Sequence, residues 1–380
     1  MKFTINRYIF LKHLLDVQKA VTSKSTIPIL TGIKLLLTEQ DLLLTGSDAS
    51  ISIEKIISSQ IEENELTIEQ KGQIVLPSRF FGEIIKKLPG KLVTLTLLGQ
   101  NKVEISSEKS VFTINGIDAN LYPSIQNIDA QDYQTIQLPT TLLKNVFSQT
   151  VIAASTSENR PILTGIYLVI KNKQLIATAT DSHRMSRRII DLPNIDDSFE
   201  KTCTVPAKSL IELSKILNDE ETVSMSISEN KILFMTDTLY FYSRLLEGNY
   251  PDVSRLLQHH YPFKLVLNAS TFLHSIERAS ILSSEGKNDF VTLHFGETVT
   301  LSSESSEIGY VEETIDYISL TSDSIKISFN PNYMKDALKV VNGQDIEISL
   351  QEEGKPFTIK LNNEDADKFI QLITPIRTRN

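Results

Sequence analysis

Nearly the same phrase occurs twice in this sequence: Ile27 to Leu35 reads IPILTGIKL, and Arg160 to Leu168 reads RPILTGIYL. The letters PILTGI are identical in both and lie 133 positions apart, starting at Pro28 and at Pro161. Self-similarity over so long a separation indicates a duplicated domain rather than a short solenoid repeat. The flanking sequence tests that interpretation.

The similarity continues at the same offset. The segment LLLTGSDASISIEKII, which starts at Leu42, aligns with LIATATDSHRMSRRII, which starts at Leu175. Farther along, IVLPSRFFGEIIKKLPG from Ile74 resembles CTVPAKSLIELSKILND from Cys203 and, more faintly, ISFNPNYMKDALKVVNG from Ile327. The chain therefore contains two clear copies of one unit and a third that shares its pattern.

Each copy is expected to contain two helices. The second helix of each copy has a Pro at or beside its start, where the missing N–H leaves no hydrogen bond unmade. Apolar residues then recur at the spacing of a helix with one buried face. They are Phe81, Ile84 and Leu88; Leu210, Leu213 and Leu217; and Met334, Ala337 and Val341. Paired apolar positions predict the first helix over 6–21, 138–154 and 268–284.

Short apolar runs between the helices, bounded by Gly, Asn and Asp, are typical of strands and hairpins. The predicted fold class is α+β, with three repeated domains at 1–126, 127–259 and 260–380. Each domain is expected to pack its two helices on antiparallel sheets built from about eight short strands.

Composition places the chain among globular proteins. Its 380 residues suffice for two or three domains, and 41% hydrophobic with 22% charged residues argue against long disorder. The start MKFTINRYIF lacks a signal-peptide pattern, and no apolar run approaches the length of a membrane span. The single Cys203 cannot form an internal disulfide, so we expect a cytoplasmic protein.

The net charge of −9 argues, by itself, against nucleic-acid binding, which needs a basic surface. The charges are segregated, however: the predicted helices hold 12 basic and 6 acidic side chains, so the remainder of the chain carries −15. An ordinary solvated face explains any single Lys, but the whole pattern suggests one basic side covered by helices. Its candidate phosphate contacts are Lys24 in the loop TSKST and, on the helices, Arg7, Lys12, Arg79, Lys86, Lys144, Lys208, Lys215, Arg278 and Lys335.

Signals for catalysis and for cofactors are absent from the sequence. It contains no GxGxxG, no P-loop, no HExxH and no GxSxG motif. Cys203 lies in an apolar run typical of a core strand, and His259 and His260 have no companion ligands at metal-site spacing. We therefore expect no catalytic residue, no metal site and no cofactor.

One segment of the second copy differs from the first in a way that the scaffold does not require. Where the first copy reads DASIS from Asp48, the second reads DSHRM, from Asp181 to Met185. Neutral drift and a specialised surface explain this difference equally well from the residues alone. If it is a surface, a His–Arg pair beside Met suits peptide binding better than acid–base catalysis.

The phrases ATDSHRMS, EGNYPD (Glu247 to Asp252) and LITPIR (Leu372 to Arg377), together with the duplication, resemble the bacterial sliding clamp family, the beta subunits of DNA polymerase III. This resemblance covers the whole chain in the right order. It implies a homodimeric ring of six similar domains, a non-catalytic processivity factor that encircles duplex DNA without reading its bases. The basic helices would then face the phosphates, and the acidic sheets would lie outside.

The resemblance also implies a hydrophobic groove between the second and third domains. In this family the groove binds short peptides, with a Leu-Phe-like anchor, from the replicative polymerase, the clamp loader and repair proteins. Carried over position by position, its deep pocket comprises Leu163, Thr180, His183, Arg184, Met185, Pro251, Leu256, Leu372 and Thr374. Its shallower part comprises Arg255, Asn330, Tyr333, Phe357, Pro375, Ile376 and Arg377. Thr374 departs from the Met or Leu of many relatives and puts a hydroxyl in the wall.

By the same resemblance, two chains are expected to close head to tail, first domain to third domain. Phe112 and Ile114, on a predicted edge strand, should pack near Ile281 and Leu282 of the partner subunit. Pairing the two edges would also remove an exposed strand that otherwise invites aggregation.

Two rival hypotheses stay open at this stage. One is a protein-interaction scaffold that never touches nucleic acid, which leaves the segregation of charge unexplained. The other is an enzyme that uses Asp181 and His183 as an acid–base pair, for which the sequence supplies no nucleophile, metal set or cofactor loop.

Overall fold

The structure, a computed structural model, describes residues 1–48, 50–99, 101–123, 135–219, 221–257, 260–283, 290–305, 308–321, 324–341 and 343–377. Its α-helices are α1 (Arg7–Gln18), α2 (Ser78–Lys87), α3 (Thr140–Val151), α4 (Ala207–Ile216), α5 (Ala269–Ser283) and α6 (Pro331–Lys339). They fall two to each third of the chain, as the sequence predicts. No helix in these ranges is both long and apolar enough to cross a membrane. The predicted boundary at 126/127 and His259 lie outside the described residues.

Strands occupy much of the remaining chain. The first third contains β1 (Lys2–Asn6), β2 (Gly32–Leu37), β3 (Asp41–Ser47), β4 (Ile51–Ser58), β5 (Thr67–Gln70), β6 (Gly72–Pro77), β7 (Leu92–Leu97), β8 (Lys102–Ser107) and β9 (Ser110–Asn115). The second contains β10 (Thr135–Pro139), β11 (Gly165–Lys171), β12 (Gln174–Thr180), β13 (Arg184–Asp191), β14 (Lys201–Pro206), β15 (Thr222–Ile227), β16 (Lys231–Thr236) and β17 (Leu239–Arg244). The last contains β18 (Phe263–Asn268), β19 (Val291–Phe295), β20 (Thr300–Ser305), β21 (Gly309–Thr314), β22 (Ser319–Thr321), β23 (Ile325–Phe329), β24 (Asp345–Leu350), β25 (Phe357–Leu361) and β26 (Phe369–Ile373).

The helices begin where the sequence supplies a cap. Asn6 precedes α1, and its side chain accepts hydrogen bonds from the backbone amides of Tyr8 and Ile9. Asn330 caps α6 in a similar way, ahead of Pro331 in the first turn. Caps of this kind satisfy backbone donors that the start of a helix leaves open.

The predicted buried face of each second helix is confirmed, with one change. Phe81, Leu210 and Met334 are buried in α2, α4 and α6. In α2, however, Ile85 takes the next buried position, and Ile84, which the spacing selected, is only half-buried. Both lie one turn beyond Phe81, since a helix brings positions three and four residues apart onto the same face.

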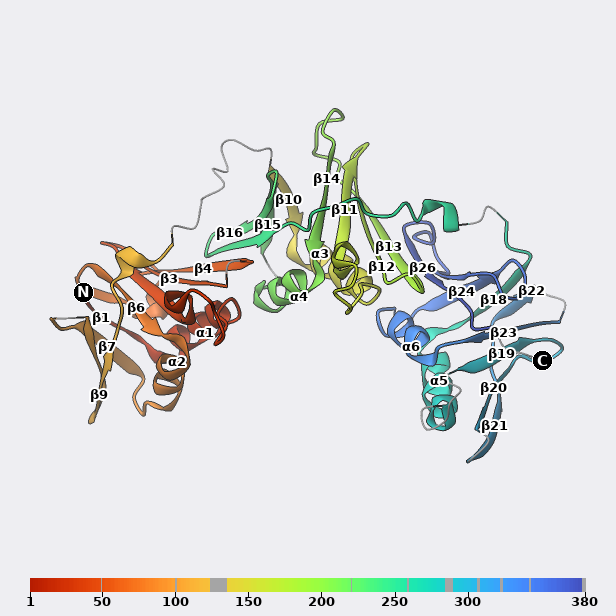
Figure 1. Ribbon diagram of the computed structural model, residues 1–380, viewed down its shortest axis with the longest axis horizontal. Coiled ribbons are helices and arrows are strands. Elements are labelled where there is room, and N and C mark those ends of the chain that lie inside the picture. Colours follow the sequence, from red (N-terminus) through yellow and green to blue (C-terminus); the bar gives the residue numbers. More distant parts are fainter. Residues whose placement is uncertain are drawn as a thin grey trace. The chain divides into compact units, whose positions relative to one another are not determined.

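Contacts divide the chain into two compact units, each formed by two segments. One comprises Met1–Thr141 and Glu212–Leu245, and the other comprises Leu142–Ile211 and Leu246–Asn380. The first unit contains a five-stranded sheet, β5-β1-β7-β8-β9, and an eight-stranded sheet, β10-β15-β16-β17-β4-β3-β2-β6. The second contains a nine-stranded sheet, β14-β11-β12-β13-β26-β25-β24-β18-β22, and a four-stranded sheet, β21-β20-β19-β23 (Figure 1). Every strand pair within these sheets is antiparallel.

Each large sheet joins strands from consecutive copies of the repeat, and both junctions have the same register. In the first unit β17 pairs with β4, so that Tyr242 lies opposite Ser52. In the second unit β26 pairs with β13, so that Leu372 lies opposite Met185. Ser52 and Met185 are 133 positions apart, which is the offset of the repeat. The duplication therefore includes the way in which one copy attaches to the next.

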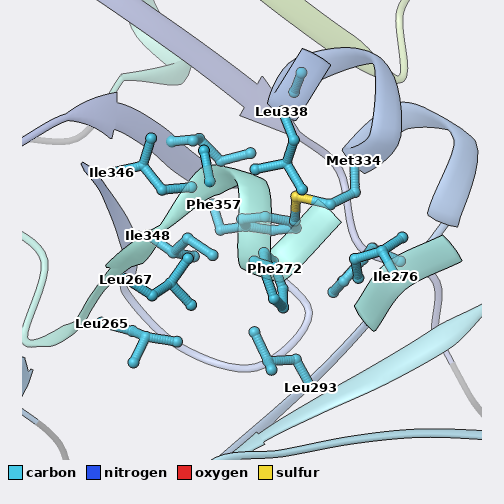
Figure 2. Close-up of a cluster of buried hydrophobic side chains, with 14 of the residues drawn as sticks. Leu265, Leu267, Phe272, Ile276, Leu293, Met334, Leu338, Ile346, Ile348 and Phe357 are labelled. Carbon is cyan, nitrogen blue, oxygen red and sulfur yellow. The ribbon is translucent and has the colours of Figure 1, made fainter. Parts of the chain in front are cut away.

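A buried core holds the helices of the third copy against its sheets. Phe272 of α5, Met334 of α6 and Phe357 of β25 pack in one cluster, and Figure 2 shows their side chains directed toward one another. The ring of Phe357 lies 5.6 Å from that of Phe329. Full burial of one such side chain contributes roughly 1.5–3 kcal/mol. This core fixes one face of the β25–β26 pair and leaves the opposite face for the candidate site.

A buried charge pair ties the first helix to the sheet. Lys55 of β4 is 3% exposed, and its Nζ lies 3.8 Å from Oδ2 of Asp16 on α1. His13 stands one turn earlier on the same helix, and burial, with the charges of Lys55 and Lys12, lowers its pKa from 6.5 to about 4. His13 therefore stays neutral in the folded protein well below neutral pH.

Replacing His13 by Val should reduce the acid sensitivity of the fold. The second copy has Val146 at the equivalent position. Between pH 6.5 and about pH 4, His13 is protonated in the unfolded chain but neutral in the folded chain. The free energy of unfolding therefore decreases as the pH is lowered through this range. Over that range the free energy of unfolding of the parent should decrease by roughly 1–3 kcal/mol more than that of His13→Val. Denaturant unfolding at pH 7 and pH 4.5 measures the difference, and the same loss in both proteins would contradict the assignment.

Candidate functional site

The segment that distinguishes the second copy forms a tight turn before β13. Oδ1 of Asp181 accepts hydrogen bonds from the backbone amides of His183 (2.9 Å) and Arg184 (3.0 Å). In the first copy Asp48 accepts the same two bonds, from residues 50 and 51, at 2.9 and 2.8 Å. The turn therefore depends on the Asp, and neither the His nor the Arg side chain is needed to form it.

Arg184 connects this turn to helix α6. Its Nε lies 3.0 Å from Oδ2 of Asp181, and its Nη1 lies 2.7 Å from Oδ2 of Asp336. The guanidinium also covers the ring of Tyr333, 4.5 Å from its centroid, in a cation–π contact. Burial, followed by the Asp181 carboxylate, raises the pKa of Tyr333. The structure thus places Arg184 directly against Tyr333 and pairs it with Asp336 of the same helix. Sequence reasoning missed Asp336, although it lies one helical turn after Tyr333.

An apolar cluster lies next to the turn. Met185, Ile370 and Leu372 are buried together, and Val253 and Leu257 pack against them. Met185 lies directly opposite Leu372 across the β13–β26 junction, so two predicted pocket residues are in contact range. Ile370 was missed, but alternation along FIQLI places it on the same face as Leu372.

The EGNYPD segment is anchored beside the same turn by its tyrosine. The hydroxyl of Tyr250 accepts a hydrogen bond of 2.9 Å from the backbone amide of Thr180. Its ring stacks on Tyr167 with centroids 5.0 Å apart, and burial raises the pKa of the phenol. Thr180 also donates through Oγ1 to the backbone oxygen of Arg184, at 2.7 Å. These contacts hold the half-buried Pro251 near the end of β12.

The C-terminal LITPIR segment runs along the other side of the turn. The backbone amide of Thr374 donates to the oxygen of His183 at 2.8 Å, and that of Ile376 donates to Ser328 at 2.7 Å. Pro375 is buried, whereas Thr374, Ile376 and Arg377 are exposed. The exposed Thr374 places its polar side chain at the surface of this segment rather than in the apolar cluster.

Two predicted groove residues have other roles. Phe357 is fully buried in the core of the third copy, because it pairs with Ile373 and alternation turns both to the face opposite Leu372. Its assignment to the groove surface is therefore wrong. Asn330 uses its side-chain oxygen to cap α6, at 2.8 Å from the amide of Asn332.

The remaining predicted groove residues differ widely in exposure. Leu163 is buried, and its backbone oxygen accepts from the amide of Ser155 at 2.8 Å. Leu256 is 44% exposed, which makes it an apolar side chain available to a ligand. Arg255 is highly exposed, and its Nε lies 3.4 Å from Oδ2 of Asp252.

The geometry does not assemble an acid–base pair. Both oxygens of Asp181 are engaged, one by two backbone amides and the other by Arg184, while the His183 side chain is exposed. Cys203 is buried, and burial raises the pKa of its thiol to about 12, so it is a poor nucleophile. Of the adjacent histidines, His259 lies outside the described residues and His260 is exposed.

Most of the predicted phosphate contacts lie at the surface. The exposed ones are Lys12, Lys24, Arg79, Lys86, Lys208, Lys215 and Arg278, whereas Lys144 and Lys335 are half-buried. Arg79 and Lys86 border a cavity of about 650 Å³ between α1 and α2, which Leu15 and Gln18 also line. Lys215 lies 2.8 Å from Glu212, and a mobile surface pair of that kind is weak enough to exchange for phosphate.

Arg7 does not contribute to that surface. It is 7% exposed and donates to the backbone oxygens of Gly90 (2.8 Å), Lys86 (3.3 Å) and Ile85 (3.4 Å). These are carbonyls at the end of α2 and just beyond it, where a helix lacks internal donors and favours a cation. Arg7 is thus a structural residue that joins α1 to α2, and its assignment as a DNA contact is wrong.

Apolar side chains are exposed at two sheet edges, on strand β9 at one and on helix α5 at the other. On β9, Phe112 is 43% exposed and Ile114 is half-buried. At the end of α5, which packs against the edge strand β21, Ile281 is 66% exposed and Leu282 is half-buried. Exposed apolar residues next to an unpaired strand are typical of a surface that pairs with another chain.

Known proteins resemble the chain over its full length. Family models of the DNA polymerase III beta subunit match it as N-terminal domain at 1–126, central domain at 137–252 and C-terminal domain at 254–377. Proteins named beta sliding clamp, from Staphylococcus epidermidis and Bacillus subtilis, are each 44% identical to it over 100% of both chains. The crystal structure of the DNA polymerase sliding clamp from Bacillus subtilis has a TM-score of 0.95 at 43% identity, again over 100% of both chains.

Proposed function

The chain belongs to the family of DNA polymerase III beta subunits, the beta sliding clamps, and from that premise we propose that it is a non-catalytic processivity factor for DNA polymerase III. Two copies close into a ring around duplex DNA, and partner proteins attach to the ring through short peptides. The chain acts in the cytoplasm, where a bacterial chromosome is replicated. Its three domains are 1–126, 127–259 and 260–380.

The repeated sheet junction is the observation that best supports a ring. Each copy of the repeat joins the next through one strand pairing, β17 with β4 and then β26 with β13. At the two ends of the series, β9 and β21 are edge strands of their sheets. Two chains satisfy both ends if the β9 of each pairs with the β21 of the other, and this arrangement closes on itself.

The surface around Arg184 supports peptide binding. Arg184, held by the carboxylates of Asp181 and Asp336, lies beside the apolar cluster that contains Met185 and Leu372. The exposed Leu256 precedes Leu257, which packs against that cluster. An apolar anchor in such a site, oriented by a few polar groups, is the usual basis of short-peptide recognition. The polymerase, the clamp loader and repair proteins would share this one site.

Solution mass together with retention on DNA tests the proposed function. The protein should sediment as a dimer, remain on a nicked circular plasmid after loading, and leave when the plasmid is linearised. A scaffold that never touches nucleic acid would not be retained at all. Equal loss from circular and linear DNA would exclude topological retention.

Neutralising Lys24, Arg79 and Lys86 together should weaken direct duplex binding while leaving a loaded ring on a circle. Each phosphate contact from a mobile side chain is weak and is eroded by salt, so removing three should lower the affinity by roughly tenfold or more at low salt. Fluorescence anisotropy with a linear duplex measures the affinity, and gel filtration with a nicked plasmid measures retention. Rapid loss of the intact dimeric variant from circles would contradict topological binding.

A further inference from the structure

The cavity between α1 and α2 belongs entirely to the first copy of the repeat. The two helices are in contact and lie side by side in Figure 1. The volume of about 650 Å³ is within the range of roughly 300–1,000 Å³ that small-molecule sites usually have. The peptide groove proposed above involves only residues of the other compact unit, so this cavity is a separate feature.

A glycine opens this cavity on the side of α2. A Cβ atom added to Gly82 would lie 2.3 Å from Nε2 of Gln18, 3.1 Å from its Cδ and 3.2 Å from its Oε1. The side-chain amide of Gln18 therefore lies against the backbone of Gly82, an approach that only glycine permits. The same Nε2 donates to the backbone oxygen of Ser78 at 2.8 Å, which fixes the amide in place. The amide and the glycine together form a flat floor.

The other two copies have larger side chains at the position of the glycine. The fifth residue of the second helix is Gly82 in the first copy, Ile211 in the second and Lys335 in the third. The twelfth residue of the first helix is, in the same order, Gln18, Val151 and Ser280. In the third copy these two positions are in contact, with Nζ of Lys335 3.4 Å from Oγ of Ser280. The repeat therefore folds without a glycine here, and the open floor is a property of the first copy.

Two cations without a carboxylate partner border the cavity. Among the described residues, neither Arg79 nor Lys86 forms an ion pair, although both line the cavity. Glu83 also lines it, but its carboxylate lies 3.8 Å from Nζ of Lys87. In the second copy, by contrast, the equivalent of Lys86 is Lys215, which is paired with Glu212 at 2.8 Å. The uncompensated charge at the cavity is thus positive and favours an anionic ligand.

The opposite wall of the cavity is apolar. Leu15 of α1 lines it and is 45% exposed, and the half-buried Val21 follows α1. Ser23 adds one hydroxyl group. An apolar wall and a flat floor suit the body of a ring system, whereas Arg79 and Lys86 suit a phosphate or carboxylate group.

We propose that this cavity binds a small ligand that joins a flat ring system to an anionic group, the chemistry of a nucleoside monophosphate. The ring lies on the amide of Gln18, and the phosphate is held by Arg79 and Lys86. Binding requires no second subunit, because every lining residue comes from the first copy.

One consequence rests on the proposed function. Arg79 and Lys86 are also proposed contacts to the phosphates of duplex DNA, so a bound nucleotide competes for them. The ligand therefore weakens direct duplex binding and leaves topological retention on a circle unchanged.

Calorimetry with adenosine 5′-monophosphate as the probe tests the site. The parent should bind this nucleotide roughly tenfold or more tightly than it binds either adenosine or inorganic phosphate, because each of these supplies only half of the contacts. Inorganic phosphate that binds as tightly as the nucleotide would reduce the cavity to an anion site and overturn the proposal. Adenosine that binds equally well, or a parent that does not bind the nucleotide, would overturn it too.

Filling the cavity tests its location. Gln18→Val combined with Gly82→Ile introduces the side chains that the second copy has at Val151 and Ile211, and it leaves every charge in place. Nucleotide affinity should fall about tenfold or more, while thermal unfolding shows that the fold survives. Unchanged affinity in the folded variant would place the ligand elsewhere.

Removing the cations gives an independent test that does not depend on the filled variant. Arg79→Gln with Lys86→Gln should weaken nucleotide binding about tenfold, at the level of roughly threefold for each exposed contact. Lys208→Gln with Lys215→Gln is the matched control, because these exposed residues are the equivalents on α4. The control should bind like the parent, and an equal loss in both variants would show non-specific attraction and overturn the site.

Fluorescence anisotropy with a linear duplex tests the competition. Saturating nucleotide should weaken duplex binding by the parent about fivefold at low salt and should not affect the filled variant. Nucleotide binding without competition would overturn the shared use of Arg79 and Lys86. A parent that binds the nucleotide but never binds a duplex would count against the proposed function and support the site alone.

Discussion

Ile281→Ala combined with Leu282→Ala is expected to yield a monomer at concentrations where the parent is a dimer. Both side chains stand at the end of α5 beside the edge strand β21, and Ile281 is 66% exposed in the single chain. A two-fold ring contains each side chain twice. If each of the four side chains contributes only about 1 kcal/mol to dimerisation, less than a fully buried side chain does, their removal raises the dissociation constant roughly a thousandfold.

Sedimentation velocity over a dilution series measures this effect, and plasmid retention should disappear with the dimer. Ile61→Ala with Leu98→Ala is a matched control, because these side chains are exposed, at 44% and 41%, and belong to neither β9 nor the α5–β21 edge. The control should remain dimeric. An unchanged dimer in the Ile281 and Leu282 variant would show that the ring closes elsewhere.

His183→Ser combined with Arg184→Ile should lower peptide affinity by an order of magnitude or more. These are the residues that the first copy has in the same turn, where Asp48 makes the same two backbone hydrogen bonds. The fold should therefore survive. The change removes the cation that joins Asp181 to Asp336 and covers Tyr333, so both carboxylates lose their ion pair with Arg184 beside the apolar cluster.

Calorimetry with a synthetic peptide that ends in Leu-Phe measures the loss. Burial of the two anchors, less the cost of ordering the peptide, gives an expected dissociation constant in roughly the micromolar range for the parent. Arg160→Ile provides a control, because Arg160 lies 3.3 Å from Ser182 in the same turn and the first copy has Ile27 at that position. If the double variant binds as tightly as this control, the site is assigned wrongly.

Much of the architecture could be predicted because it depends on short-range patterns in the sequence. A helix with one buried face leaves a regular spacing of apolar residues, and this spacing located α2, α4 and α6 from Phe81, Leu210 and Met334. The repeated PILTGI phrase identified the duplication, and the contrast between DASIS and DSHRM singled out the one turn whose side chains the scaffold does not need.

The sequence alone could not decide which charged residues are available to a ligand. Arg7 and Arg79 look alike as basic residues near helix starts, yet Arg7 is buried on carbonyls at the end of α2 while Arg79 is exposed. The guanidinium of Arg7 donates to backbone oxygens at the end of α2, which belong to a segment about 80 residues away. Only the packed structure brings them together.

The same limit applies to the candidate site. Phe357 and Leu372 were assigned to one groove, but strand pairing turns them to opposite faces of the sheet, and Asp336 reaches Arg184 across 152 positions of sequence. By itself the sequence determined the repeated unit, its helices, the segregation of charge and the turn that differs between copies. The tertiary structure decided the partners of each polar group and the face on which each side chain lies. The physical reason is that periodicity and capping act between near neighbours, whereas register and ion pairing join residues that meet only when the chain is folded.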